Sequence, residues 1–183
     1  AHLMTYMPRI KQTGESFIDQ YGKKQKTRKE TGHEWFETQD PIAYYEEFEK
    51  EKVVWQEMVQ KPTFSYDYTR TYFCLDTGRI LTGVNLKYLA CILNSRLFFY
   101  IVKEFYGGGA LGGTGIRMKH TFLNYAPIPK VNNGFNQLFC ELSDTIISRI
   151  DSGLSTQSTE SQIDLMVYKF YELSYAEASL IVP

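Results

Sequence analysis

The chain has few of the features that mark a disulfide-stabilised or membrane-spanning protein. It contains only 3 cysteines in 183 residues, and no two of them form a CxxC pair, which argues against a disulfide framework and a zinc site. We therefore expect buried free thiols in a reducing cytoplasm. The most apolar run, residues 86–102, is interrupted by four polar or charged residues, unlike a membrane span. The chain begins Ala-His-Leu-Met, so we expect a piece of a longer protein.

Acidic residues are missing from one long stretch. The net charge of −1 gives no general reason to expect a polyanionic partner. However, residues 105–140 contain no Asp or Glu, whereas residues 46–51 contain four Glu. Residues 23–29, KKQKTRK, contain five basic residues. The chain therefore has two locally positive segments. Their basic residues are Lys23, Lys24, Lys26, Arg28 and Lys29 in the first, and Arg117, Lys119, His120 and Lys130 in the second.

A dense glycine segment lies in the acid-free stretch. Residues 106–120 have the sequence YGGGALGGTGIRMKH, with six of the 13 glycines of the chain. Gly107-x-Gly109-x-x-Gly112 matches the dinucleotide-binding string, and Phe105-x-Gly107-x-Gly109 resembles a methyl-donor-binding string. Both need a preceding strand, and the dinucleotide site also needs an acid about 20 residues later. We predict a helix before this segment, and no acid follows before Glu141. A bound cofactor is therefore not expected here.

Catalytic patterns are absent as well. The sequence has no HExxH motif and no GxSxG elbow, and His2, His33 and His120 are isolated. Glu49 and Lys52 have the spacing of an acid–lysine pair, but the surrounding EEFEKEK is more typical of a solvated turn. We expect no active site in this chain.

Hydrophobic periodicity predicts an α+β fold. Residues 12–30 are predicted to form a polar helix or arm, and VVWQEMV (53–59) a buried strand. Residues 63–75 alternate well enough for a hairpin around Asp67–Arg70, and GRILTG (78–83) predicts a further strand. Residues 85–105 are apolar on nearly all sides at helical length, which predicts a central buried helix.

The last third is predicted to be helical. Residues 135–150 have a 3.6-residue apolar period, and residues 152–161 are a polar linker. Thr159-x-x-Gln162 and Ser174-x-x-Glu177 are capping-box patterns that predict two helix starts. The prediction is thus a small mixed or antiparallel sheet around a central buried helix, with a helical C-terminal third. We expect three parts: an N-terminal helix or basic arm (1–32), a core (33–151) and a C-terminal helical segment packed on it (152–183).

Several stretches, in this order, resemble one known family. They are HEWFET (33–38), KVVWQEMVQKPTFSYD (52–67), ILTGVNLKYLACILNSRLFFYI (80–101), the glycine segment with Gly115-Ile116-Arg117, Pro127-Ile128-Pro129 and the closing DLMVYKFYELSYAEASLI. The chain, from about His33 to Ile181, resembles the TaqI-like C-terminal specificity domain of type II restriction–modification and adenine-specific DNA methyltransferase enzymes. It departs from the family pattern at Ala126, where a Leu is usual, and at Glu172, where a Gly is usual.

The resemblance implies a target-recognition module and not an enzyme. The Asn-Pro-Pro-Tyr motif of the methyltransferases is absent, as is any nuclease motif. S-adenosylmethionine is then expected in the catalytic domain of the parent, a type II restriction enzyme, an adenine-specific methyltransferase or both, and no cofactor in this fragment. The implied partners are double-stranded DNA and that catalytic domain, in the bacterial cytoplasm and without a membrane.

Basic and glycine residues are the candidate DNA contacts. Arg117 is the candidate for a bidentate contact to guanine, and Lys119 and His120 for phosphate or base edges. The basic residues of 23–29 would add sequence-independent affinity. Glycine allows the main chain to approach phosphate closely, at Gly107, Gly108, Gly109, Gly112 and Gly113. Two alternatives remain: a protein–protein docking module for the catalytic domain or a second copy, and a stand-alone enzyme that binds a nucleotide at the glycine segment.

Overall fold

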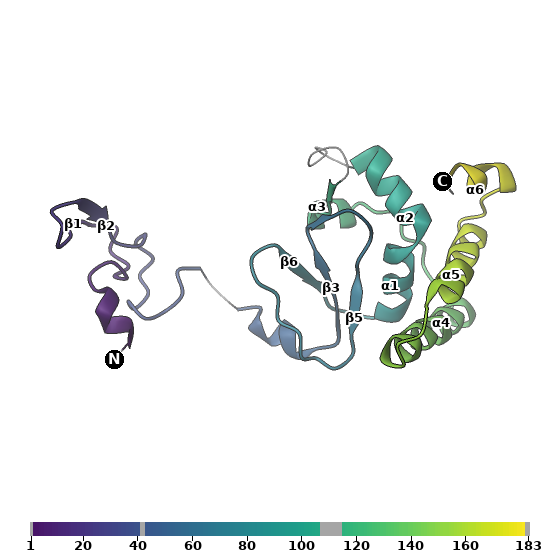
Figure 1. Cartoon of the computed structure of the whole chain (residues 1–183), viewed down its shortest axis with the longest axis horizontal. Helices are drawn as coiled ribbons and strands as arrows, with labels where there is room; N and C mark the ends of the chain where they lie inside the picture. Colours follow the sequence, from purple (N-terminus) through teal and green to yellow (C-terminus); the bar gives the residue numbers. More distant parts are fainter. Residues whose placement is uncertain (1, 41–42, 107–114, 182–183) are drawn as a thin grey trace. The chain divides into compact units, whose positions relative to one another are not determined.

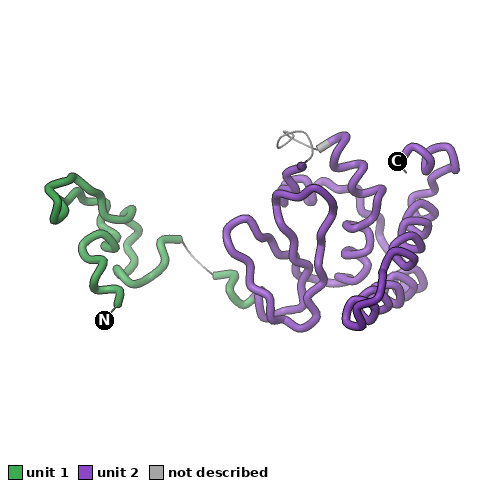
Figure 2. The backbone as a smooth tube through the Cα atoms, in the orientation of Figure 1, with its two compact units in different colours: residues 1–46 green, residues 47–183 purple. Residues whose placement is uncertain are grey.

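The computed structural model describes residues 2–40, 43–106 and 115–181. It divides into two compact units, residues 1–46 and 47–183 (Figure 2). The C-terminal helices belong to the same unit as the sheet. The predicted parts, residues 1–32, 33–151 and 152–183, stay a prediction.

The first unit contains a short hairpin where we predicted a polar helix or arm. After η1 (His2–Tyr6), strands β1 (Ser16–Ile18) and β2 (Lys24–Lys26) pair antiparallel. The helical alternative of that prediction, over residues 12–30, is therefore wrong. Asp19 explains the turn, because its carboxylate accepts hydrogen bonds from the amides of Tyr21 and Lys23. Such side-chain bonds compete with the backbone bonds of a helix.

The second unit contains a three-stranded antiparallel sheet. Its order is β5 (Ser65–Asp67), β3 (Lys52–Gln56) and β6 (Gly78–Leu81), and β4 (Met58–Val59) follows β3. The strand predicted over residues 53–59 is confirmed as far as Gln56, whereas residues 58–59 form a separate strand in another sheet. The strand predicted over 78–83 is confirmed at residues 78–81. The predicted hairpin is wrong, because β5 pairs with β3 and residues 68–77 connect β5 to β6. The turn is again set by an aspartate: Asp67 accepts bonds from Thr69 Oγ1 and from two amides further along the chain.

A broken helix occupies the centre of this unit. It consists of α1 (Leu86–Asn94), α2 (Arg96–Ile101) and the π-helical turn η3 (Val102–Tyr106), which follow one another as predicted for residues 85–105. Ser95 causes the break, since its hydroxyl caps the amide of Phe98 at the start of α2. In Figure 1 the sheet lies on one side of α1, and α4 and α5 lie on the other.

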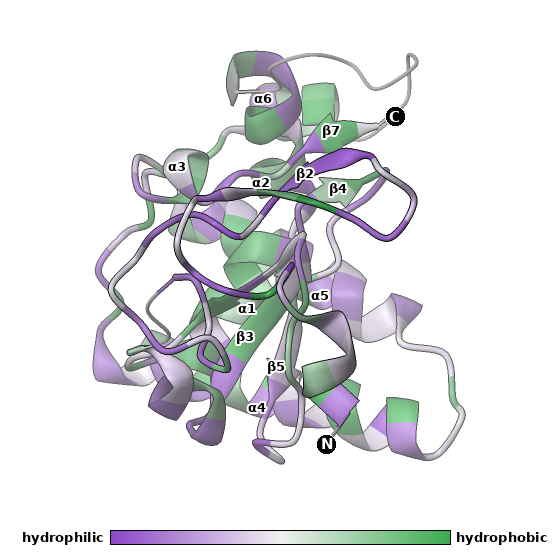
Figure 3. Cartoon of the chain, turned by 90° about the vertical axis from the view of Figure 1, so that its left-hand side faces the viewer, coloured by the Kyte–Doolittle hydropathy of each residue, from purple (hydrophilic) through white to green (hydrophobic). Residues whose placement is uncertain are grey.

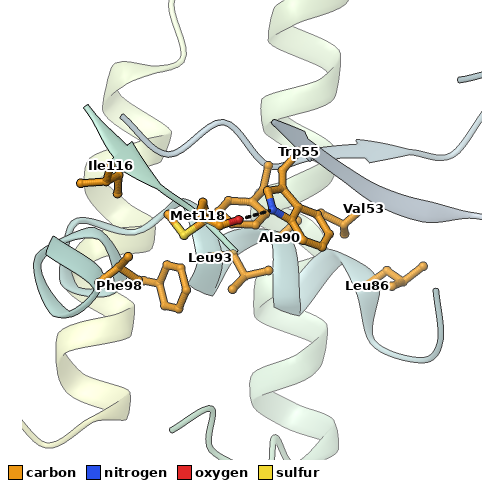
Figure 4. Packing of buried hydrophobic residues seen from close by; sticks show 10 residues of the cluster. Val53, Trp55, Leu86, Ala90, Leu93, Phe98, Ile116 and Met118 are labelled. Carbon is orange, nitrogen blue, oxygen red and sulfur yellow. Dashed lines mark hydrogen bonds between the residues drawn. The ribbon is translucent and has the colours of Figure 1, made fainter. Parts of the chain in front are cut away.

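Two hydrophobic clusters therefore share α1 and α2. On the sheet side, Ala90, Leu93 and Phe98 pack with Val53 and Trp55 (Figure 4). On the opposite side, the buried residues of these helices pack with three helices that follow. Those helices are α4 (Asn133–Asp151), α5 (Gln157–Phe170) and α6 (Tyr175–Ile181). In Figure 3, β3 and α1 are coloured hydrophobic and β2 hydrophilic.

The two predicted capping boxes have different outcomes. At α6, Glu177 accepts a bond from the amide of Ser174, and the Ser174 hydroxyl accepts one from the amide of Glu177, as predicted. The box at Thr159–Gln162 is wrong, because α5 already begins at Gln157 and Thr159 is buried inside it. The predicted linker accordingly ends at Thr156.

The cysteines are free thiols as expected, but the expected burial holds only for Cys91. Cys91 is buried, and Cys74 and Cys140 are half-buried. Burial raises the pKa of Cys91 to about 12, so its thiolate is scarcely populated at neutral pH. None of the described helices has the length and apolar character needed to cross a membrane.

A buried ion pair fixes the start of β3 to the end of β5. Lys52 Nζ lies 2.6 Å from Asp67 Oδ2, and both side chains are 0% exposed. Lys52 also donates to the carbonyl of Phe48 at 2.7 Å. Removing one partner of such a pair leaves an uncompensated buried charge. The pair therefore holds the turn after β5 in place.

Replacement of Asp67 will test this role. We expect Asp67→Ala to lower the free energy of unfolding by about 3–5 kcal/mol, because Lys52 loses its counter-charge. Urea unfolding followed by circular dichroism at 222 nm will measure it, since all the α-helices in the described residues lie in the second unit. The control is Lys50→Ala, which removes an exposed ion pair with Glu47 and will cost at most about 1 kcal/mol.

The pH dependence of the free energy of unfolding provides a second test of Asp67→Ala. Burial by itself raises the pKa of Asp67, but bonds from Lys52, Thr69 and the Tyr72 amide outweigh it and lower the pKa to about 2 from the usual 3.8. The stabilisation is thus complete above about pH 4 and is lost as the pH falls towards 2. The difference between the native chain and Asp67→Ala will shrink over that range. A difference that stays constant down to pH 2 would contradict this account.

Candidate nucleic-acid interface

The segment that carries Arg117 is attached to the sheet region by a short strand. Strand β7 (Ile116–Arg117) pairs antiparallel with β4, with Arg117 opposite Met58 and Ile116 opposite Val59. Ile116 is buried in the sheet-side cluster. The end of the glycine segment is thus fixed against the folded core.

Met118 fixes the direction of its neighbours. Its side chain is 0% exposed, its amide donates to the carbonyl of Glu57, and its carbonyl accepts from Trp55 Nε1 at 3.1 Å (Figure 4). In an extended chain, alternate side chains point to opposite sides. Because Met118 points into the core, Arg117 and Lys119 on either side of it point away from the core.

Arg117 is held by a buried carboxylate. Its Nε donates to Glu57 Oε1 at 3.1 Å, and the side chain of Arg117 is 48% exposed, against 6% for Glu57. Among the described residues, neither terminal nitrogen of Arg117 has an acceptor. The guanidinium group is therefore anchored at one edge and keeps two donors for a ligand.

A second arginine shares the same carboxylate. Arg79 Nη2 donates to Glu57 Oε2 at 2.9 Å. Arg79 Nη1 donates to the carbonyls of Asp76 and Gly78, at 2.6 and 3.0 Å. Two guanidinium groups on one carboxylate leave the cluster one positive charge in excess.

Lys119 and His120 continue the positive segment. Lys119 is half-buried, and His120 is exposed at the start of α3 (His120–Leu123). Within the described parts of the chain, no acidic side chain forms an ion pair with either residue, in keeping with the acid-free sequence around them. Arg117, Lys119 and His120 thus lie together on one described segment, and their contacts with DNA stay a prediction.

The basic run of residues 23–29 lies on the hairpin of the first unit. Lys23, Lys24, Lys26 and Lys29 are exposed. Arg28 differs from them. Its Nε donates to the carbonyl of Ile10 at 2.9 Å, and its terminal nitrogens donate to the carbonyls of Trp35 and Glu37. The structure therefore uses the guanidinium of Arg28 inside the unit, which favours a structural role, and leaves the four lysines as the candidate phosphate contacts.

The predicted glycine contacts fall on a segment that the structure does not describe. Gly107, Gly108, Gly109, Gly112 and Gly113 all lie outside the described residues. The described chain resumes at Gly115, which is buried next to β7. In the described residues, no group of His, Cys, Asp and Glu side chains could hold a metal ion.

Sequence reasoning missed Glu57 and Arg79. The available signal was a carboxylate inside the apolar run VVWQEMV, because a buried charge requires a partner. The identity of that partner depends on the pairing of β3 with β6 and of β4 with β7, which the sequence pattern did not reveal.

One family model matches the chain, that of the TaqI-like C-terminal specificity domain, over residues 8–128. The matched range begins before His33, where the predicted resemblance started, and it ends before α4. It contains the Glu57–Arg79–Arg117 cluster and the basic hairpin. No curated protein and no solved structure gives a significant match. Since the family model covers most of the chain, the chain belongs to the TaqI-like C-terminal specificity domain family.

Proposed function

We propose that this chain is the sequence-specific double-stranded DNA recognition module of a bacterial, cytoplasmic restriction–modification enzyme. It positions a separate methyltransferase or nuclease part on the target. Membership of the specificity-domain family supports the DNA-recognition role. The observation that carries the proposal is the outward-facing guanidinium of Arg117, anchored on buried Glu57.

The chemistry of Arg117 matches a base edge. Guanine presents two acceptors, O6 and N7, in the major groove, and a planar guanidinium can donate to both. Lys119 points away from the core with Arg117, which supports a contact with a phosphate near that base. Phosphate contacts of this kind set the register of the protein on the duplex.

The exposed lysines of the hairpin supply a different kind of affinity. Lys23, Lys24, Lys26 and Lys29 are within seven residues of one another in the sequence. Ammonium groups attract phosphates as point charges and release counterions, which gives binding that depends on salt and not on base sequence. We assign these lysines to sequence-independent contact.

Methyl transfer or cleavage belongs, in this proposal, to the catalytic part of the parent, which would bind S-adenosylmethionine if it methylates.

The second candidate function is docking onto that part. It is favoured by α4, α5 and α6, which lie outside the matched range and expose Leu138, Leu165 and Leu180.

Binding by Arg117 variants will test the main proposal. Selection from a random duplex pool with the native chain is expected to enrich one sequence that contains guanine. Arg117→Ala will weaken binding to that duplex by about 1–3 kcal/mol at fixed salt, because the two base-edge bonds are removed. Fluorescence anisotropy will measure the Kd. The control is Arg149→Ala on α4, whose Nε donates to the carbonyl of Ser155; its Kd will be unchanged.

Two results would contradict the proposal. A selection that enriches no sequence would remove the recognition function and leave the docking role. Equal binding of the selected and scrambled duplexes by the native chain would do the same.

The lysines of the hairpin generate a separate prediction. We expect the combined replacement of Lys23, Lys24, Lys26 and Lys29 by Gln to weaken binding to selected and scrambled duplexes by the same factor. The slope of log K against log salt will become shallower by about 0.9 for each phosphate that the variant no longer neutralises. Titrations at several salt concentrations will measure it. Arg28 is left unchanged because it holds the unit together. A weakening confined to the selected duplex would show that these lysines read bases instead.

A further inference from the structure

We propose that Glu57 and Arg79 are positioning residues that fix the guanidinium of Arg117 and thereby determine specificity for guanine in the target. This inference rests on the proposed function and adds the residues that orient its guanine contact. It concerns two residues that do not themselves reach the DNA in this account.

The backbone of Glu57 is hydrogen-bonded at both its amide and its carbonyl, and its side chain is buried. Its amide donates to the carbonyl of Thr77 at 3.0 Å, its carbonyl accepts from the Met118 amide, and its side chain is buried. It lies between Gln56, which pairs with Gly78, and Met58, which pairs with Arg117. The strand pairings therefore bring Arg79 and Arg117 to the same carboxylate.

The two arginines have different roles in this cluster. Arg79 uses both terminal nitrogens on Glu57 and on the carbonyls of Asp76 and Gly78, so it is committed to the protein. Arg117 uses only Nε in the described residues. With Arg79 occupying Glu57 Oε2 and Arg117 on Oε1, the carboxylate cannot rotate without losing one of them. Arg79 thus fixes Glu57, and Glu57 fixes Arg117.

The geometry favours one base edge. Binding at Nε leaves the two terminal nitrogens side by side, which matches the two adjacent acceptors of guanine. Adenine offers N7 but has an amino donor in place of O6, so a fixed pair of donors meets a donor there. An arginine without an anchor could instead turn to a phosphate, which carries no sequence information. Positioning before binding also avoids the cost of ordering a long side chain.

The test compares guanine with 7-deazaguanine, which lacks the N7 acceptor, at each guanine of the duplex selected by the native chain. For the guanine that depends on Arg117, we expect the native chain to lose at least about tenfold in affinity, equivalent to about 1.4 kcal/mol. Glu57→Gln will reduce this ratio to less than about threefold. Its affinity for a scrambled duplex will be equal to that of the native chain or higher, because a negative charge is removed near the DNA.

The double variant separates positioning from general destabilisation. Arg117→Lys keeps the positive charge but removes the planar pair of terminal nitrogens. In this background, Glu57→Gln will not further change the ratio of affinities for the guanine and 7-deazaguanine duplexes. Folding of each variant will be checked by circular dichroism. A folded Glu57→Gln protein that keeps the native ratio would overturn the inference, and the recognition function would stand. A purely structural role of Glu57 would lower affinity for both duplexes and would also overturn it.

A measurement on the native chain without DNA covers the case in which Glu57→Gln does not fold. In protein labelled with ¹⁵N-arginine, the Nε–H signal of Arg117, assigned by its loss in Arg117→Lys, will exchange with water at least about tenfold more slowly than that of exposed Arg9, because it donates to a buried carboxylate. Exchange as fast as that of Arg9 would overturn the inference. A slow signal in a chain whose selection enriches no sequence would support the Glu57 anchor and refute DNA recognition, so the two failures are distinguishable.

Discussion

The second unit depends on the burial of a helix that is apolar on two of its sides. Residues of α1 and α2 contribute to both hydrophobic clusters, one facing the sheet and one facing α4 to α6. Each fully buried Leu, Ile or Phe side chain contributes about 1.5–3 kcal/mol. Neither the sheet nor helices α4 to α6 alone would be sufficient, because the other apolar face of the helix would be left in water. Asp164 on α5 strengthens the packing of the C-terminal helices, since its carboxylate binds the amide and the side chain of Arg96 at the start of α2.

The candidate interface is a consequence of how the sheet-side cluster is completed. Trp55 is buried against α1, and its ring N–H needs an acceptor in that position. The Met118 carbonyl supplies it, so the chain after the glycine segment must run alongside β3 and β4. Burial of Met118 then directs Arg117 outward beside Glu57. The basic residues are therefore placed by core packing, and their orientation does not depend on a loop alone.

Local patterns predicted some parts of this structure and could not predict others. The apolar residues of 85–105 and the Ser174–Glu177 box carry their structural information within a few residues, and both predictions are confirmed. The hairpin of residues 16–26 depends on one aspartate whose side chain replaces helical bonds, and a polar sequence gives no apolar period to reveal it. The bond between Glu57 and Arg117 spans 60 residues and depends on strand pairing. Arg117 was singled out because it stands in an acid-free stretch, and its base contact stays a prediction; its anchor, Glu57, could not be recognised from the sequence.

The central claim is that Arg117 contacts the major-groove edge of a guanine. Methylation protection by dimethyl sulfate, which modifies guanine N7, tests it most directly on the duplex selected by the native chain. The account predicts that one guanine is protected by the native chain and is modified freely when Arg117→Ala is bound at saturating concentration. Protection that is the same with both proteins, or no protected guanine with the native chain, would contradict it.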